Sequence, residues 1–240
     1  RSSDLVGFGS YHSFPVMVAA RLLRVPYLLH ESNSIPGKVN RLLSKDAVVT
    51  GIQFPQTAYH LKGRTHQVEM PLHRTNYSTD ASYSHYGLDP TRCTLLIFGG
   101  SQGAAALNAL IPSLFLTGEI DSSDLQVIHF TGKEERVADL KAQYEKQGVT
   151  AFVGAYESQM QRAWEIATVV ISRSGAGTIA EQIEYEVPGI LIPFPFASDN
   201  HQEKNADFMV DTVQGAYKIL EAEVTPSLLA KTLGSFLAHK

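Results

Sequence analysis

From residue 94 to the end, short apolar runs alternate with longer amphipathic runs, and this alternation constrains the fold more than any other feature of the sequence. The short runs have the length and β-branched content of strands, whereas the longer runs have helical spacing. Strands that alternate with helices form parallel sheets covered by helices. We predict strands at 94–98, 125–130, 149–153, 168–172, 189–193 and 216–220, and helices at 104–116, 134–146, 158–166, 176–186, 202–211 and 226–237. Residues 94–240 are therefore expected to form a doubly wound, Rossmann-like α/β domain.

The first 74 residues show the same alternation in a shorter form. The predicted strands are residues 4–8, 26–30 and 47–50, and the predicted helices are residues 15–23 and 40–43. These strands are too few for an independent α/β domain, so we interpret residues 1–74 as the C-terminal part of a first Rossmann-like domain that is only partly present. The chain carries no secretory signal. It begins with Arg1 instead of an initiator Met and continues almost at once into a strand-like stretch, which predicts a start in mid-protein. Residues 75–93 are polar and rich in Tyr and Ser, as expected of an interdomain linker.

Composition limits the possible classes of function. The net charge of −4 argues against a general nucleic-acid binder, which normally presents a basic face. Cys93 is the only cysteine, so an intrachain disulfide and a cysteine-rich zinc site are excluded, and a reducing cytosol is the expected compartment. No stretch approaches the roughly 18 to 20 apolar residues that cross a bilayer. These features predict an ordinary globular protein of the cytoplasm.

A first glycine-rich turn, residues 99–104 (GGSQGA), joins a predicted strand to a predicted helix. Glycines let the backbone approach a ligand, and the exposed N–H groups of a helix start favour a phosphate. Ser101 adds a hydroxyl that can donate to that phosphate. A tight turn with no ligand explains the same residues equally well. The pattern is neither a Walker loop nor the dinucleotide fingerprint.

A second glycine-rich turn, residues 172–178 (SRSGAGT), also lies between a strand and a helix. Arg173 places a permanent cation beside this helix start. Glu181 follows about one helical turn later, where a carboxylate can accept two hydrogen bonds from a ribose diol. Alternatively, Arg173 and Glu181 form a surface ion pair that contributes little. The occurrence of two such turns in one predicted sheet favours a nucleotide site.

Two further polar clusters follow predicted strands. Residues 199–206 (DNHQEKNA) suit hydrogen bonding to sugar hydroxyls, although a helix cap formed by Asp199 or Asn200 with Glu203 explains them as well. Residues 30–33 (HESN) end an apolar run, and a buried His with a turn is the alternative there. We find no metal-ligand spacing and no Asp-x-Asp pair. We therefore expect no metal and no cofactor. If a diphosphate leaves during a reaction at this site, its charge must be met by helix starts, Ser101 and Arg173.

In order along the chain, these motifs together resemble the MurG-type transferases of peptidoglycan synthesis. Each motif is weak alone, but the ordered set is specific, and it extends over nearly the whole chain. The matching positions are residues 7–11 (GFGSY), Ser13, Pro15, residues 30–33, Pro36, Gly37, Asn40, residues 99–104, residues 173–176, Glu181, Pro193, Asp199, His201, Gln202, Asn205 and Ala206.

The resemblance implies a GT-B fold, with two Rossmann-like domains facing a cleft and the donor held mainly by the second. It also implies an inverting transfer of N-acetylglucosamine from UDP-N-acetylglucosamine to the muramyl 4-hydroxyl of lipid I, which forms lipid II. The partners would be UDP-N-acetylglucosamine and lipid I, with no nucleic acid. The enzyme would lie peripherally on the inner face of the plasma membrane, and would serve cell-wall biogenesis, cell shape and division.

The resemblance also implies roles for particular residues. Ser101 would contact the diphosphate, and the backbone of Val153 would read the uracil edge. Gln202 would bind the sugar hydroxyls, Asn33 would reach in from the first domain, and Arg173 would balance leaving-group charge. The residues that would wrap the nucleotide sugar, with the last of them on the ribose diol, are Ala176, Gly177, Thr178, Ile179, Ala180 and Glu181.

The sequence departs from the family at two places. The family's first glycine-rich loop, which holds its usual catalytic base, has no counterpart here, so we assign no base and expect this chain alone to turn over poorly or not at all. At residues 69–74 (EMPLHR) the family expects Gly-Asn-Pro-x-Arg near the donor, and either His73 or Arg74 could fill the Arg position. We assign Arg74. The alternatives are another UDP-sugar GT-B enzyme, such as a hydrolysing 2-epimerase, or a non-catalytic nucleotide-sugar binding module.

Overall fold

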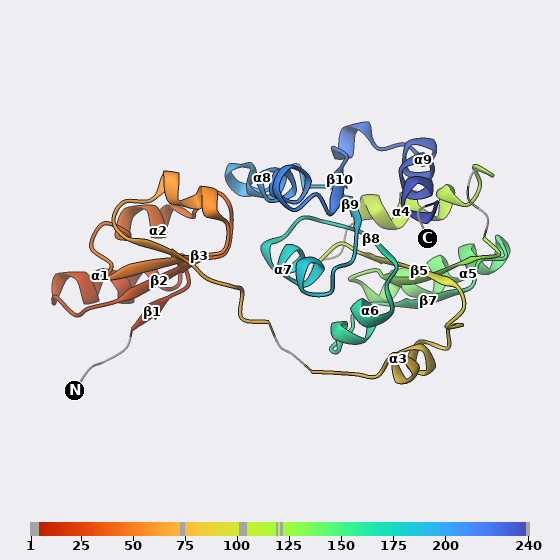
Figure 1. Ribbon diagram of the computed structural model, residues 1–240, viewed down its shortest axis with the longest axis horizontal. Helices are drawn as coiled ribbons and strands as arrows, with labels where there is room; N and C mark the ends of the chain where they lie inside the picture. The colour runs from red at the N-terminus through yellow and green to blue at the C-terminus, as the bar shows by residue number, and fades with distance from the viewer. Residues whose placement is uncertain (1–4, 73–74, 101–104, 119, 121, 239–240) are drawn as a thin grey trace.

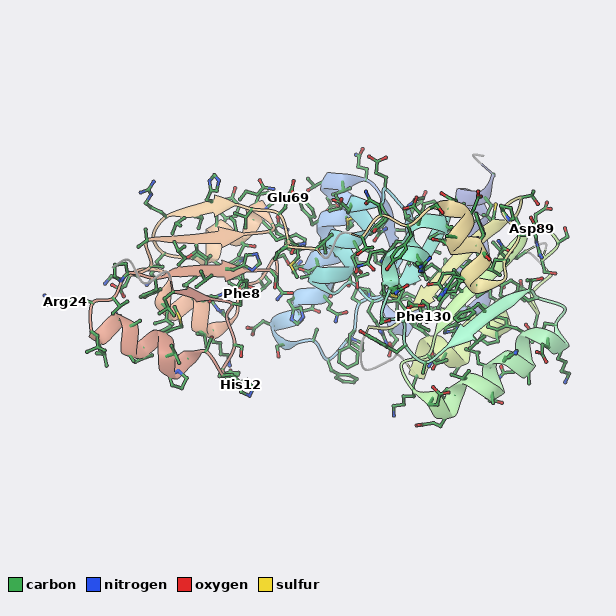
Figure 2. All side chains as sticks on the ribbon, turned by 90° about the horizontal axis from the view of Figure 1, so that it is seen from below. Phe8, His12, Arg24, Glu69, Asp89 and Phe130 are labelled. Carbon is green, nitrogen blue, oxygen red and sulfur yellow. The ribbon has the colours of Figure 1, made fainter. Side chains whose placement is uncertain are left out.

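The computed structural model describes residues 5–72, 75–100, 105–118, 120 and 122–238. Its strands lie in two separate lobes, the first built by the N-terminal part of the chain and the second by the remainder (Figure 1). In Figure 2, Phe8, His12 and Arg24 lie on the first lobe and Phe130 and Asp89 on the second. The described strand pairs of both lobes are parallel.

The first lobe is a four-stranded sheet in the order β1-β2-β3-β4. The three strands expected from the sequence are present, but β4 and a 3-10 helix, η1, were not predicted. The polar residues of β4 are mostly exposed, so this strand lacks the apolar alternation by which a strand is recognised. The elements are β1 (Val6–Gly7), α1 (Phe14–Leu22), β2 (Leu28–Glu31), α2 (Lys38–Leu43), β3 (Val49–Ile52), η1 (Pro55–His60) and β4 (Thr65–Gln67).

The second lobe is a six-stranded sheet in the order β10-β9-β8-β5-β6-β7, and the predicted doubly wound parallel sheet is confirmed. Each predicted strand and helix is present, with its bounds shifted by a few residues at most. The strands are β5 (Cys93–Phe98), β6 (Leu125–Phe130), β7 (Ala151–Gly154), β8 (Val169–Ser172), β9 (Gly189–Leu191) and β10 (Ala216–Lys218). The helices are α4 (Ala105–Leu114), α5 (Val137–Lys146), α6 (Met160–Ile166), α7 (Ala176–Glu184), α8 (His201–Phe208), which continues as a π-helical turn (Met209–Val213), and α9 (Pro226–Leu237).

The second sheet is buried on both faces, which explains why its strands read as continuous apolar runs. Side chains alternate along β5, so Leu95 and Ile97 enter one core while Leu96 and Phe98 enter another. Helices α4, α5 and α9 cover the first core, and α6 covers the second. The strands of this sheet, and the loops that leave their ends, are thereby held in place by an apolar core on each face.

The segment 75–93, expected as a linker, contains helix α3 (Thr79–Tyr86). The Ser78 hydroxyl accepts a hydrogen bond from the Ala81 N–H at its start, and Gly87 ends it in the left-handed conformation. Tyr86 and Leu88 are buried in the second core, and α3 packs against α6. The helix was missed because its sequence, TDASYSHY, is polar and has no apolar stripe.

Candidate functional site

The strand order of the second sheet reverses between β5 and β8. From β5 the chain moves outward through β6 and β7 on one side, and from β8 through β9 and β10 on the other. Ligands of open parallel sheets bind at the carboxyl ends of the strands beside such a reversal. Phe98 and Ser172, the last residues of β5 and β8, are paired in register. The two glycine-rich turns found in the sequence therefore leave the sheet side by side at this point.

The turn after β5 uses a backbone conformation that suits glycine. Gly100 has φ +84°, in the left-handed region that favours glycine, and a Cβ at this position would have no described atom within 4 Å. Ser101 lies outside the described residues, as does Arg74, so the contacts predicted for both stay predictions.

The turn after β8 opens directly into α7. Gly175 is the N-cap residue, with φ −64° and ψ 151°, and as a glycine it has no side chain that could cap the helix. The first turn of α7 also carries no acidic residue. Backbone N–H groups and the positive end of the helix dipole at such a start favour an anion such as a phosphate.

The six predicted donor residues of α7 divide by burial. Ile179 is fully buried in the core between α7 and α8, so only its backbone is open to a ligand. Ala176 and Ala180 are also buried, whereas Gly177, Thr178 and Glu181 are half-buried. The accessible groups on this helix are therefore its N-terminal backbone, the Thr178 hydroxyl and the Glu181 carboxylate.

Glu181 occupies a desolvated position. Burial raises the pKa of the Glu181 carboxyl, and the nearby Trp164 indole opposes that shift. Trp164 is itself 1% exposed, and its N–H makes no hydrogen bond among the described residues. Arg173 pairs with Glu221 instead of Glu181, so the predicted alternative of an ion pair between Arg173 and Glu181 does not form. A half-buried carboxylate of this kind is suited to accept hydrogen bonds from a diol.

Arg173 is buried and already engaged by protein atoms. Its guanidinium donates to the carbonyl oxygens of Ile192 and Pro193, each at 3.1 Å, and forms an ion pair with Glu221. Only 6% of Arg173 is exposed. The predicted role of Arg173 in balancing leaving-group charge stays a prediction, and these partners give it a different task, which is to tie the exits of β8 and β9 together.

Val153, predicted to read a base through its backbone, lies on β7. This strand is at the edge of the sheet and pairs only with β6 among the described strands. Its outer backbone groups are therefore available to a planar hydrogen-bonding ligand. The neighbouring Phe152 packs against Tyr86 and Phe130, at ring distances of 4.9 and 6.2 Å, so its ring belongs to the core.

Gln202 lies in the first turn of α8. Its Oε1 accepts a hydrogen bond from the Phe194 N–H at 3.0 Å, and its backbone carbonyl accepts one from the Ser174 hydroxyl at 2.7 Å. The Gln202 oxygen is thus occupied, and its amide NH₂ is the edge that can donate to sugar hydroxyls. Asn200 is the N-cap residue of α8, as one of the two predicted alternatives had it, but its side chain donates to the Glu203 carboxylate and does not cap the backbone.

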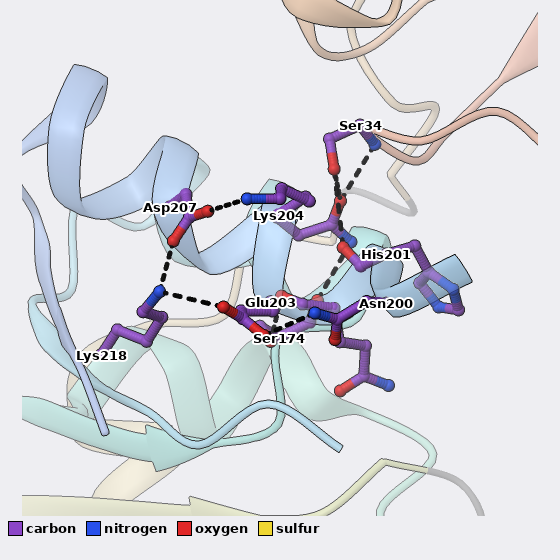
Figure 3. A network of polar contacts seen from close by, with 10 residues as sticks. Ser34, Ser174, Asn200, His201, Glu203, Lys204, Asp207 and Lys218 are labelled. Carbon is purple, nitrogen blue, oxygen red and sulfur yellow. Dashed lines mark hydrogen bonds and ion pairs between the residues drawn. The ribbon is translucent and has the colours of Figure 1, made fainter. Parts of the chain in front are cut away.

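The first lobe meets the second at α8 through polar contacts. Asn205, fully buried on α8, bonds to Asn33 and Ser34 of the first lobe and to Ser174 of the second. Figure 3 shows Ser34 and Ser174 within one polar network along α8. An ion pair between Arg41 and Asp199, 2.5 Å apart, adds a more exposed link. The sequence pointed to this polar cluster but not to its position between the lobes.

An apolar contact completes the junction. Phe54, from the first lobe, is fully buried in the core formed by α7 and α8, where its ring lies edge-on to Phe208 at 5.1 Å. The Gln53 amide beside it donates to the Ala176 carbonyl at 3.1 Å. The first lobe therefore packs against the two helices that carry most of the predicted donor residues. Nothing in the sequence pattern indicated this, because a single aromatic after a strand has no periodicity.

Within the described ranges, no group of three or more His, Cys, Asp or Glu side chains could hold a metal ion. The helices in those ranges are all too short or too polar to span a bilayer.

Two α/β lobes, each built on a parallel sheet, are the architecture of the GT-B fold class. The glycosyltransferase family 28 C-terminal domain matches residues 94–240, and the N-terminal domain of the same family matches residues 3–50. The chain belongs to glycosyltransferase family 28.

Relatives and solved structures agree with this assignment. The UDP-N-acetylglucosamine--N-acetylmuramyl-(pentapeptide) pyrophosphoryl-undecaprenol N-acetylglucosamine transferase of Protochlamydia amoebophila is 49% identical over 95% of this chain. The enzyme of that name from Chlamydia pneumoniae is 36% identical over 95%. The chain spans 61% and 62% of the lengths of these two relatives.

Among solved structures, Acinetobacter baumannii MurG has a TM-score of 0.77 and 30% identity, covering 97% of this chain and 64% of its own. A putative UDP-N-acetylglucosamine 2-epimerase of Listeria monocytogenes has a TM-score of 0.65 at 10% identity, covering 98% of this chain and 65% of its own, and shows the fold alone. The expected GT-B fold is confirmed.

Proposed function

We propose that this chain is the donor-binding part of an enzyme that transfers N-acetylglucosamine from UDP-N-acetylglucosamine to the muramyl 4-hydroxyl of lipid I, forming lipid II. The observation that carries the proposal is the α7 helix start at the strand reversal, uncapped and facing a turn from β5, with Glu181 one turn along the helix. The names of the P. amoebophila and C. pneumoniae relatives support this donor and acceptor.

In the proposed site each group has a distinct task. The start of α7 and the turn after β5 hold the diphosphate, and they stabilise the charge that develops as UDP leaves. Glu181 holds the ribose diol, and the β7 backbone at Val153 reads the uracil edge. Gln202 and Asn33 hold the sugar, since Asn33 contacts Asn205 on the helix that also carries Gln202. The transfer is a single inverting displacement, and we assign no general base among the described residues.

The acceptor chemistry also suggests where the protein works. Lipid I is a membrane-anchored acceptor, so we propose that the enzyme acts in the cytoplasm, peripherally on the inner face of the plasma membrane. Turnover by this chain alone is expected to be poor or absent. The donor site is nevertheless expected to bind its ligand.

Calorimetric titration of the chain with UDP-N-acetylglucosamine, UDP and ADP tests the proposal. We expect both uridine ligands to bind, and ADP to bind much more weakly. Glu181→Ala removes hydrogen bonds to a charged acceptor, so UDP affinity should fall roughly ten- to a hundredfold. The matched control is Glu184→Ala, an exposed carboxylate on the same helix that should leave affinity unchanged. Equal binding of ADP and UDP, or equal effects of the two substitutions, would contradict the assignment.

A further inference from the structure

The side-chain amide of Asn205 is held by four hydrogen bonds. Its Oδ1 accepts from the Ser34 N–H at 3.0 Å and from the Ser34 hydroxyl at 2.7 Å. Its Nδ2 donates to the Ser174 carbonyl at 3.1 Å and to Asn33 Oδ1 at 3.3 Å. Asn205 is fully buried, so no water competes for these positions.

Two of these partners fix which way the Asn205 amide faces. A backbone N–H can only donate and a backbone carbonyl can only accept. The Ser34 N–H therefore requires the Asn205 oxygen, and the Ser174 carbonyl requires its nitrogen. The second lobe supplies one constraint and the first lobe the other, and both require the same orientation of the amide.

The orientation of Asn205 in turn fixes that of Asn33. Because Asn205 Nδ2 can only donate, the Asn33 atom that faces it must be the amide oxygen. The Asn33 backbone is held as well, since its N–H donates to Glu31 Oε1 at 3.0 Å and its carbonyl accepts from the Thr57 hydroxyl at 2.9 Å. The NH₂ group of Asn33 has no protein partner among the described residues, and the side chain is half-buried.

We propose that Asn205 is a positioning residue that turns the NH₂ edge of Asn33 toward the donor sugar, so that Asn33 recognises a hydrogen-bond acceptor on the ligand. The inference rests on the proposed function, because it takes the sugar of the nucleotide donor as the group that Asn33 meets. It deepens that proposal because it assigns Asn33 as the donor in its hydrogen bond to the sugar. This bond depends on docking of the lobes, since Asn33 lies on the first lobe and Asn205 on the second.

Asn205→Asp tests the relay with a nearly isosteric change. The carboxylate still accepts both bonds from Ser34, but it can no longer donate to Asn33 or to the Ser174 carbonyl. The Asn33 amide then turns its NH₂ toward the new carboxylate and its oxygen toward the ligand. Ser34→Ala is the matched control at the same interface, because it removes one bond to Asn205 but keeps the Ser34 N–H that fixes the orientation.

The measured quantity is the ratio of the affinities for UDP-N-acetylglucosamine and UDP, because effects on the shared nucleotide cancel in it. We expect Asn205→Asp to lower this ratio roughly tenfold and Asn33→Ala to lower it by a similar factor. The variant with both substitutions should lower the ratio no further than either substitution alone, because both act on the same hydrogen bond. Ser34→Ala should keep the ratio of the unsubstituted chain. An unchanged ratio in Asn205→Asp, or an equal loss in Ser34→Ala, would overturn the relay.

A ligand-free measurement separates this proposal from the proposed function. The side-chain NH₂ of Asn33, identified in a ¹⁵N spectrum by its loss in Asn33→Ala, should exchange rapidly with water in the unsubstituted chain. In Asn205→Asp it should exchange more slowly, because it then donates to a buried carboxylate. If no uridine ligand binds but this slowing is seen, the proposed function fails and the relay stands. If exchange is the same in both proteins, the relay fails whatever the chain binds.

Discussion

Phe54→Ala should open the junction between the two lobes. The Phe54 ring is fully buried among residues of α7, α8 and β9, although its backbone belongs to the first lobe. Replacing a buried Phe by Ala costs about 3 to 5 kcal/mol, which includes loss of the edge-on contact with Phe208. The other links between the lobes are the hydrogen bonds of Asn205 to Ser34 and Asn33, the bond from Gln53 and a more exposed ion pair, each interaction contributing about 1 kcal/mol. The ring is therefore the largest single contribution to docking.

Urea unfolding followed by circular dichroism measures this effect. We expect the free energy of unfolding to fall by about 3 to 5 kcal/mol, a large part of the roughly 5 to 15 kcal/mol typical of a folded domain. The affinity for UDP should also fall, since Phe54 packs against Ala176 and Ile179 at the start of the donor helix. Tyr59→Ala is the control, because Tyr59 lies nearby in η1 but is 89% exposed, and it should change stability by less than about 0.5 kcal/mol. A loss below about 1 kcal/mol in Phe54→Ala would refute the view that this ring joins the lobes.

Burial raises the pKa of Glu181, and a diol binds the ionised carboxylate. The affinity for UDP-N-acetylglucosamine should therefore fall as the pH decreases, beginning at a pH above the ordinary titration range of Glu, and titrations across pH should show that Glu181→Gln abolishes this dependence. His129 is fully buried, and its ring bonds to Tyr144 and Asn108. Burial lowers its pKa from 6.5 to about 3, so the folded state keeps it neutral while the unfolded state takes up a proton below pH 6.5. The free energy of unfolding should therefore be full above pH 6.5 and should decline by about 1.4 kcal/mol per pH unit as the pH falls toward 3. His129→Gln should flatten that decline in acid unfolding curves, and an unchanged slope would refute the assignment. Arg173→Lys keeps the charge, but the lysine cannot reach two carbonyls and Glu221 together, so the melting temperature should fall. If stability is unchanged and UDP binding is weakened, Arg173 instead acts directly on the leaving group.

The strands of the second lobe could be predicted because burial on both faces leaves uninterrupted apolar runs such as 94–98 and 125–130. The elements that were missed have no such signal. β4 is a short strand with exposed polar residues, and α3 is a polar helix whose stability comes from its caps and from two buried residues at its end. Their formation depends on neighbours that are distant in sequence.

The site could be predicted in part, for a similar reason. A glycine-rich turn between a strand and a helix is visible in the sequence, and parallel-sheet geometry alone requires such turns to gather at one edge. What the turns face is decided by strand order, which the sequence does not state. The parallel pairing of β5 with β8 brings residues 99–100 and 173–175 together, although they are far apart along the chain.

Arg173 shows where reasoning from residue types reaches its limit. A cation beside a phosphate-binding turn suggests direct neutralisation, but the structure commits this guanidinium to two carbonyls and to Glu221, some fifty residues later. A fork of donors is as well suited to joining backbone segments as to binding phosphate, so the residue type alone does not distinguish the two uses. The same holds for Asn205, whose place in a polar cluster suggested a sugar ligand or a cap. Its two backbone partners come from different lobes, so its contribution to the site is to set the direction of a neighbouring amide once the lobes have met.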